Sequence, residues 1–504
     1  MQWVSIRQDV KIGNLRDAPF SGIQLFMQPG KAKLVQAWID AAVRGELTET
    51  QARQLYQHGP EVVTLVLMAA SKRIAELQGP SGIPSPSTPS GQVPVYAKPN
   101  TSKRRKRPGA KPGHPGQRRS PPTRIDQQRE HRLKRCPYCN GPLQRCTRTR
   151  TRIIEDIPEQ IQPVVTEHLI HRDYCPYCRK HVEPVVPDAL PNAMLGHHVI
   201  SLTSWLHYGL GVTIDQIVDI LSYHLQTKLT PGGLVNAWQR LAEILVEWYE
   251  QIGVQAKQSA YLHADETGWR VNGQTRWLWC FANAQVCYYM IDRCRGQPAL
   301  RKFFTEVFTG VLITDFWAAY ASVEAADRQY CLPHLLRELE KVDQGNDSAE
   351  WRAFAKKLRR LLRDGLRLRK RKDFTSRRYQ KRINRLNRRI GLLAQEDHGD
   401  ADAQRIANRL RRYAEYIFTF LDYPYVPADN NFAERQIRPA VILRKNSQSN
   451  RSDRGAATQA VMMSVYRTLR LRNLNPTETI ANALKTYLTT GQLPSLPAGT
   501  TANG

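Results

Sequence analysis

The sequence predicts a multidomain α/β protein, and three features support that fold class. The chain has 504 residues, of which 41% are hydrophobic, which favours several domains over a single core. Residues 257–345 alternate short apolar runs of strand type with turn signals. Residues 346–427 show only helical spacing, and two Cys-x-x-Cys pairs precede both regions.

The first predicted strand runs from Tyr261 up to Asp265 and stops before turn signals at Gly268 and Asn272-Gly273. Three strands joined by hairpins, a helix and a returning strand match the opening of a ribonuclease-H-like fold with a mixed sheet. In that topology the ends of the first and fourth strands become neighbours. The later strands are predicted at 276–282, 286–292, 310–315 and 328–332, and the helix at 298–308.

Two acidic residues, Asp265 and Asp315, occupy those strand ends, and a third, Glu434, lies in a predicted helix with Asp429 as its N-cap. Carboxylates are ligands that Mg²⁺ prefers, and two such ions can activate water and stabilise the leaving oxygen in phosphodiester cleavage. We therefore expect these three acids to be catalytic and to bind two Mg²⁺ (or Mn²⁺) ions per active site, with Asp265 bridging the ions. Glu266 is the alternative to Asp265, although alternation along a strand points it to the opposite face.

Two cysteine knuckles have the spacing of a zinc ribbon. Their thiolates would form one closed, structural Zn²⁺ site, with residues 164–171 as a strand leading into the second knuckle. A redox pair, or a knuckle that has lost its metal, is the alternative. The four predicted ligands are Cys136, Cys139, Cys175 and Cys178.

Residues 191–256 are predicted to be all-helical. Their second main helix begins with Thr230 as N-cap, followed by proline at the first helical position. A helix-turn-helix arrangement would place Asn236, Gln239 and Arg240 near a DNA groove. A helical pair that only packs is the alternative.

The formal net charge is +29, from 74 basic and 45 acidic side chains, which indicates a nucleic-acid partner. Residues 103–119 hold eight Lys/Arg and no acid within a linker rich in Pro, Ser and Gly, and residues 351–390 hold 18 Lys/Arg against two acids. Both segments are expected to follow DNA phosphates, and solvated surface charge is the alternative for each. The predicted DNA-binding residues are Lys103, Arg104, Arg105, Lys106, Arg107, Arg435, Arg438, Arg444 and Lys445.

No apolar run approaches the ~18 residues needed to span a bilayer, and the N-terminus lacks the apolar region of a secretory signal. Scattered cysteines outside the knuckles indicate a reducing compartment. We expect no membrane partner and a cytoplasmic, nucleoid-associated bacterial protein.

Composition and spacing together predict eight segments. They are an N-terminal helical region (1–78), a disordered basic linker (79–128), a zinc ribbon (129–190), a helical DNA-binding region (191–256), the two parts of the catalytic domain (257–345 and 428–475), an all-helical basic insertion between those parts (346–427), and a C-terminal helix with a tail disordered from Leu493 (476–504).

At these residues the chain resembles transposases of the insertion sequence 66 family, which are DDE-type enzymes. The resemblance spans roughly residues 100 to 480 and includes the glycines from Gly109 to Gly116 and both knuckles. Its motifs are Asp265-Glu-Thr-Gly-Trp, Thr314-Asp315 followed by Tyr320, Cys331-x-x-His334, Asp429-Asn-Asn-x-x-Glu434-Arg-x-x-Arg438-Pro, Arg444-Lys-Asn and Asp453-Arg-Gly455.

The resemblance implies an enzyme that cuts the ends of a mobile element with Mg²⁺, exposes a 3′-hydroxyl and joins it to target DNA. It implies Asp265, Asp315 and Glu434 as the catalytic triad. Its partners would be double-stranded element ends and target DNA, further copies of the chain on that DNA, and accessory proteins encoded by the element. Cys331 and His334 resemble an accessory motif of several DDE transposases, and a strand cysteine with a helix-start histidine is the alternative.

The chain departs from the family pattern in two places. Residues 1–80 lack the sustained heptads of the family's coiled coil, and residues 447–450 lack its aromatic side chains. Two further functions remain open: a sequence-specific DNA-binding regulator with an inactive nuclease fold, and a structure-specific nuclease that does not transfer strands.

Overall fold

This computed structural model describes part of the chain, which divides into two compact units, Met1–Arg107 and Pro108–Gly504. In the first unit the described residues include helix α2 (Glu49–Gln57), whose Leu55 is buried. The predicted basic linker segment 103–107 lies outside the described residues, as does most of the predicted N-terminal helical region, 1–78. The described residues are 37–38, 40–42, 47–57, 63–64, 66–67, 122–144, 150–158, 161–371 and 375–499.

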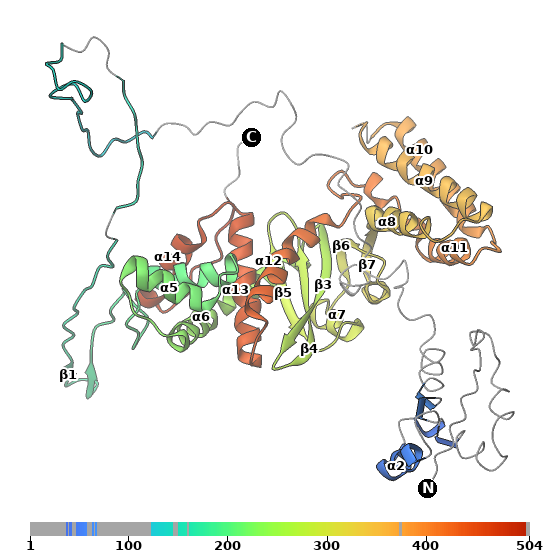
Figure 1. Cartoon of the computed structure of the whole chain (residues 1–504), viewed down its shortest axis with the longest axis horizontal. Helices are drawn as coiled ribbons and strands as arrows, with labels where there is room; N and C mark the ends of the chain where they lie inside the picture. The colour runs from blue at the N-terminus through green and yellow to red at the C-terminus, as the bar shows by residue number, and fades with distance from the viewer. Residues whose placement is uncertain are drawn as a thin grey trace, which may run out of the picture. The chain divides into compact units, whose positions relative to one another are not determined.

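The second unit contains a mixed five-stranded sheet with the order β5-β4-β3-β6-β7 (Figure 1). β3, β4 and β5 are antiparallel neighbours, whereas β6 runs parallel to β3 and β7 runs parallel to β6. This agrees with the predicted mixed sheet. The strands are β3 (Tyr261–Val271), β4 (Gln274–Ala282), β5 (Cys287–Asp292), β6 (Phe308–Thr314) and β7 (Ala325–Tyr330).

The prediction that the first strand stops at Asp265 is wrong. β3 continues to Val271 because β4 pairs with it along its whole second half, down to the pair Val271↔Gln274. The hairpin turn comes at Asn272 and Gly273, whose φ values of 49° and 72° suit a two-residue turn of type I′. The predicted helix 298–308 is also shorter, since α7 (Gln297–Phe303) ends before β6 begins.

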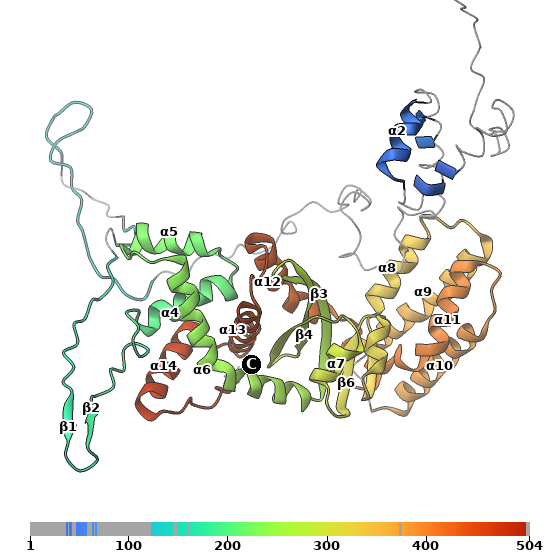
Figure 2. The ribbon, with the colours of Figure 1, turned by 90° about the horizontal axis from the view of Figure 1, so that it is seen from below.

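Long helices cover the sheet on the side of β5. α6 (Pro231–Lys257) starts at the predicted N-cap Thr230, whose side chain accepts a hydrogen bond from the N–H of Gly233. α6 buries Trp238 and Trp248, and α13 (Asp453–Leu471) packs against both α6 and β5 (Figure 2). The 27 residues of α6 therefore extend far beyond a short recognition helix and serve the core along much of their length.

Side-chain capping differs among the smaller helices of this region. α5 (Ile214–Leu225) opens with a capping box between Thr213 and Gln216. α4 (His197–Ser204) contacts α14 (Pro476–Thr490) and α6.

Predicted disorder from Leu493 onward is wrong for residues 493–499, because Leu493 is buried and Trp248 donates a hydrogen bond to the carbonyl of Pro494 at 2.6 Å.

A second apolar core lies on the other side of the sheet. Helices α9 (Ala349–Arg369), α10 (Arg377–Gln395) and α11 (Ala401–Tyr413) contact one another and stand side by side in Figure 1. Their buried faces share this core with α8 (Leu332–Val342) and with Val311 and Ile313 of β6. The basic helices therefore pack against the sheet through this shared apolar core.

α12 (Asn431–Ser447) brings the chain back to β3 and β4. It has the basic residues Arg444 and Lys445 in its last turn and contains Pro439 in its interior. None of the described helices has the length and apolar character needed to cross a bilayer.

Candidate active site

Asp265 and Asp315 lie at matching positions on two neighbouring strands. The parallel pairing of β3 with β6 ends at His263↔Ile313, and each aspartate comes two positions later in the chain. Asp315 is the first residue after β6, while Asp265 is within β3 at the point where β6 leaves it. The predicted neighbourhood of these two acids is therefore confirmed, although only one of them ends its strand.

Both aspartates have strongly raised pKa values. Burial raises the pKa of Asp265 well above its ordinary value, and the negative charges of Glu266, Asp315 and Glu434 raise it further. Burial and the charges of Glu266 and Glu434 raise the pKa of Asp315 to about 7, against a hydrogen bond from the N–H of Trp317 at 2.9 Å. Such mutual repulsion means that the carboxyl groups occupy one small region and compete for protons.

Glu434 enters this region from the first turn of α12. Its Oε1 lies 3.4 Å from Nη2 of Arg337 and 3.5 Å from Nε2 of His334, both on α8. The side chain of Glu434 is 38% exposed, so this carboxylate faces solvent more than the two aspartates do. We call Asp265, Asp315 and Glu434 the acid cluster.

Asn430 fixes the start of α12 to β3. Its side chain pairs with Nδ1 of His263 at 2.9 Å and donates to the carbonyl of Ala264 at 2.8 Å. Its backbone N–H donates to Sγ of Cys331 at 3.2 Å. Asn430 is the N-cap residue of α12, so the prediction that Asp429 is the N-cap is wrong. The side chain of Asp429 accepts a hydrogen bond from the backbone N–H of Asn431.

Glu266 lies near the acid cluster, since its charge raises the pKa values of Asp265 and Asp315. Its carboxylate accepts hydrogen bonds from Arg295 at 2.9 Å and from the hydroxyl of Tyr320 at 2.5 Å. The Arg295 guanidinium lies between the rings of Trp277 and Trp317, 4.6 Å and 4.1 Å from their centroids. Glu266 is thus held in a buried ion pair directly beside Asp265 and Asp315.

Arg295, His263 and the anchoring role of Asn430 were not predicted from the sequence. Arg295 has no motif around it, and only the Tyr320 match hinted at a polar contact near the first strand. Asn430 belongs to the motif that begins at Asp429, but its partner His263 is 167 positions away.

Cys331 and His334 both lie beside the acid cluster. Cys331 follows β7 directly and is the N-cap residue of α8, and burial raises the pKa of its thiol to about 12. Burial lowers the pKa of His334, whose Nε2 approaches Glu434 as described above. The two residues therefore occupy a strand end and a helix start, and they also border the site.

The model of the family described as Transposase IS66 family matches residues 192–458, more than half of the chain and all of the acid cluster. The chain belongs to the IS66 family of transposases. None of the curated proteins compared with the chain matches it.

The basic residues predicted near the transposase site have different surroundings. Arg435, Arg438 and Lys445 are exposed on α12. Arg444 is partly buried, and its guanidinium donates to the carbonyl of Gly268 and to the hydroxyl of Thr267. Burial lowers the pKa of Arg444. This arginine ties α12 to β3, whereas the others are open to a ligand.

The segment before the Asp453-Arg-Gly455 motif is hydrogen-bonded to β3 and its turn. Trp269 donates a hydrogen bond to the side chain of Asn450 at 2.7 Å, and Asn450 exchanges backbone hydrogen bonds with Arg270 and Asn272. Asp453 lies 3.6 Å from Arg276, and Ser452 caps α13. The segment between α12 and α13 therefore extends the edge of β3 beyond the acid cluster.

The described structure does not support the predicted four-sulfur zinc site. β1 (Asp173–Cys175) and β2 (Lys180–Val182) form a hairpin around the second knuckle, and backbone N–H groups lower the pKa of Cys175. The predicted strand 164–171 is absent, and Val164 is 92% exposed. Among the residues that the structure describes, no group of three or more His, Cys, Asp or Glu side chains is arranged to hold a metal ion.

Proposed function

We propose that the chain is a DDE-type transposase that cuts the ends of a mobile element and joins the exposed 3′-hydroxyl to target DNA. The observation that carries this proposal is the acid cluster, in which β3, the end of β6 and α12 each supply one carboxylate. The charges of Asp315 and Glu434 both raise the pKa of Asp265, and the charge of Glu434 also raises the pKa of Asp315. Membership of the transposase family gives this arrangement its substrate class, DNA.

The sheet supports a ribonuclease-H-like assignment. Three antiparallel strands followed by α7 and the parallel strands β6 and β7 give the order expected for that fold. The basic helices α9 to α11 lie in sequence between β7 and α12, so they interrupt the catalytic domain in this proposal. Glu434 then returns to the site through α12.

Three carboxylates are the kind of ligand that divalent cations with a preference for oxygen bind, Mg²⁺ or Mn²⁺, although the three are not arranged around a common ion position in this structure. Two partly buried aspartates with raised pKa values form a site in which positive charge would replace protons and relieve repulsion. Asp265, Asp315 and Glu434 would hold the ions. When bound, two such ions supply an activated water and stabilise the leaving oxygen.

The other residues of the site position these acids. Asn430 holds α12, and with it Glu434, against β3. The pair of Glu266 with Arg295 fixes the chain beside Asp265 and keeps one more acid from facing solvent. Arg435, Arg438 and Lys445 on α12, together with the linker residues 103–107, would neutralise DNA phosphates without reading sequence.

The test uses labelled DNA carrying the terminal inverted repeats that flank the coding sequence, Mg²⁺ and a plasmid target. The wild-type chain should nick the element ends and join them to the plasmid. Asp265→Asn keeps size and shape but removes the negative charge, so cutting should be lost. Asp219→Asn is the matched control, since Asp219 is exposed on α5, and it should cut like the wild type.

Each alternative function has its own outcome in this assay. Binding of the ends without cutting would favour the regulator with an inactive nuclease fold. Cutting without joining would favour the nuclease that does not transfer strands. Cleavage by Asp265→Asn at the wild-type rate would refute the assignment of the acid cluster.

A further inference from the structure

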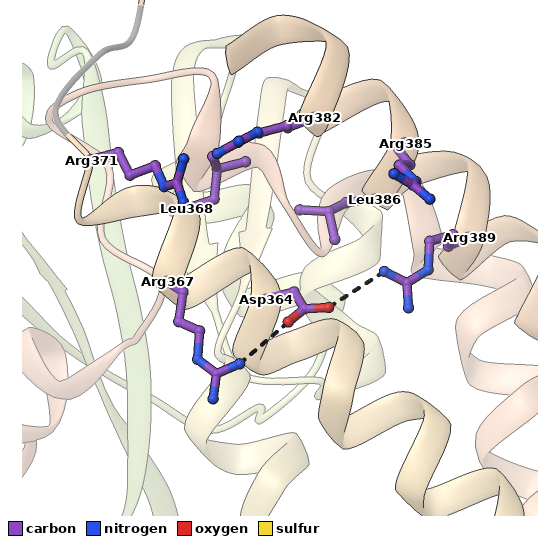
Figure 3. Close-up of a pocket in the computed structure, with 8 residues that line it drawn as sticks. All are labelled: Asp364, Arg367, Leu368, Arg371, Arg382, Arg385, Leu386 and Arg389. Atoms are coloured by element: carbon purple, nitrogen blue, oxygen red, sulfur yellow. Dashed lines mark hydrogen bonds and ion pairs between the residues drawn. The ribbon is translucent and has the colours of Figure 1, made fainter. Parts of the chain in front are cut away.

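A recess of about 270 Å³ opens between helices α9 and α10, away from the acid cluster. Figure 3 shows arginine side chains from both helices around it, with Leu368 and Leu386 between them. Among the described residues that line it, Asp364 is the one acidic side chain. The lining arginines are Arg367, Arg371, Arg382, Arg385 and Arg389. We call this site the arginine recess.

Charge in the arginine recess is poorly balanced. Asp364 lies 3.5 Å from Arg367 and 3.4 Å from Arg389, so one carboxylate is shared by two arginines. Within the described part of the chain, no carboxylate lies within ion-pair distance of Arg382 or Arg385, and both side chains are exposed. Five guanidinium groups against one carboxylate give the recess an excess of four positive charges.

Some arginines of the same helical bundle have acidic partners. Arg405 and Arg409 both pair with Glu338, and Arg411 lies 2.5 Å from Asp397. In the arginine recess one carboxylate faces five guanidinium groups, and bringing like charges together costs free energy unless an anion joins them.

The arginine side chain favours phosphate as that anion. Its planar guanidinium donates two parallel hydrogen bonds to phosphate oxygens, and it is less strongly hydrated than an ammonium group. The surrounding surface extends the positive charge, since residues 351–390 hold 18 Lys/Arg against two acids. A positive strip on this scale fits a polyanion with evenly repeated charges.

We infer that the arginine recess binds the phosphate backbone of duplex DNA, as a contact separate from the acid cluster. This inference rests on the proposed function for the identity of the polyanion. The contact is made to phosphates, so it adds affinity regardless of base sequence. It would hold DNA that flanks the reacting strand while the acid cluster works on one bond.

The experiment measures binding of the full chain to a random-sequence DNA duplex in EDTA at several salt concentrations. Arg382→Gln/Arg385→Gln removes two unpaired charges from the recess. Arg412→Gln/Lys485→Gln is the matched control, because both basic side chains are exposed, lie outside residues 351–390 and do not line the recess. The double change in the recess should flatten the slope of log K against log[salt] by about 1.8. The wild type should therefore lose about 12-fold more affinity than this variant between about 50 and about 200 mM salt.

The control variant should keep the wild-type slope, and both variants should keep the wild-type melting temperature. An unchanged slope for Arg382→Gln/Arg385→Gln would overturn the inference, and so would equal losses in both variants. If the double variant does not fold, Arg385→Gln alone carries the test with a slope change of about 0.9. Because EDTA removes cleavage from the assay, failure of the proposed chemistry leaves this result intact, and loss of recess binding leaves the cleavage test intact.

Discussion

Asp315 connects the chemistry of the site to the stability of the metal-free protein. Its pKa in the folded chain is about 7, against an ordinary value of 3.8. The folded state therefore binds this proton more tightly than the unfolded state does. Its contribution to stability is complete below the unfolded pKa and is lost as the pH rises through the folded pKa.

We predict that the metal-free protein loses up to about 4 kcal/mol of unfolding free energy through Asp315 between pH of about 4 and about 7. Denaturant unfolding in EDTA across this range measures it, and Asp315→Asn should remove that part of the slope. His263 titrates in the same range with the opposite sign, since burial lowers its pKa to about 4. The comparison of wild type with Asp315→Asn isolates the aspartate, and parallel pH profiles for the two proteins would contradict the prediction.

Glu266 illustrates how far alternation can be trusted at the residue scale. Adjacent positions on a strand point to opposite faces, and the sequence argument sent Glu266 away from Asp265 for that reason. In the structure Arg295 and Tyr320 hold its carboxylate close enough to raise the pKa values of Asp265 and Asp315. Because Arg295 comes from the loop after β5, no local sequence pattern around residue 266 predicts the contact between Glu266 and Arg295.

At the scale of elements, the start of α12 depends on one amide. Asn430→Ala would leave Nδ1 of His263 and the carbonyl of Ala264 without their partner in a buried place. We predict a loss of about 2–4 kcal/mol of unfolding free energy and impaired DNA cutting, because Glu434 sits one turn away. Denaturant unfolding and the end-cutting assay measure the two effects. Asn431→Ala on the same turn should stay within about 0.5 kcal/mol, and equal losses in both variants would contradict the role of Asn430.

A pair of glycines tests the packing of the basic helices. A Cβ on Gly365 of α9 would lie 2.6 Å from Cε1 of buried Phe418, whereas a Cβ on Gly391 of α10 meets nothing within 4 Å. We predict that Gly365→Ala destabilises the protein by about 1–3 kcal/mol despite the higher helix propensity of alanine. Gly391→Ala should instead stabilise it by about 0.5–1 kcal/mol. Thermal unfolding measures both, and a stabilised Gly365→Ala would show that α9 does not pack closely on Phe418.

Most elements of the catalytic region could be predicted because their signals are local. The Thr230 cap of α6, the Asn272-Gly273 turn and the two aspartates two positions beyond the β3–β6 pairing all follow from short patterns. The length of β3 could not, because β4 decides how far the hairpin pairs. The burial of Leu493 could not be predicted either, because the neighbouring Pro494 is hydrogen-bonded to Trp248, which lies in a helix far earlier in the chain.

At the scale of the whole molecule, the cysteine knuckles show what the spacing of ligands alone cannot predict. Spacing alone predicted four ligands around one zinc ion, because each knuckle presents two thiolates. The described residues give each knuckle its local turn but not the intervening strand that would bring the pairs together. A short motif can fix the geometry of one half of a site, whereas joining the halves is a property of the tertiary fold.

The acid cluster joins parts of the chain that are distant in sequence, so an ion bound there should stabilise the whole second unit. Asp265, Asp315 and Glu434 come from β3, the end of β6 and α12, and their repulsion is greatest when the carboxyl groups are ionised without a counter-charge. We predict that Mg²⁺ at about 100 times its dissociation constant raises the unfolding free energy at neutral pH by about 2.7 kcal/mol. Calorimetric melts with and without the ion measure it. Asp265→Asn/Asp315→Asn should melt at the same temperature in both conditions, while Asp219→Asn should respond like the wild type. A wild-type melt that saturating Mg²⁺ leaves unchanged would contradict the binding of metal by these acids.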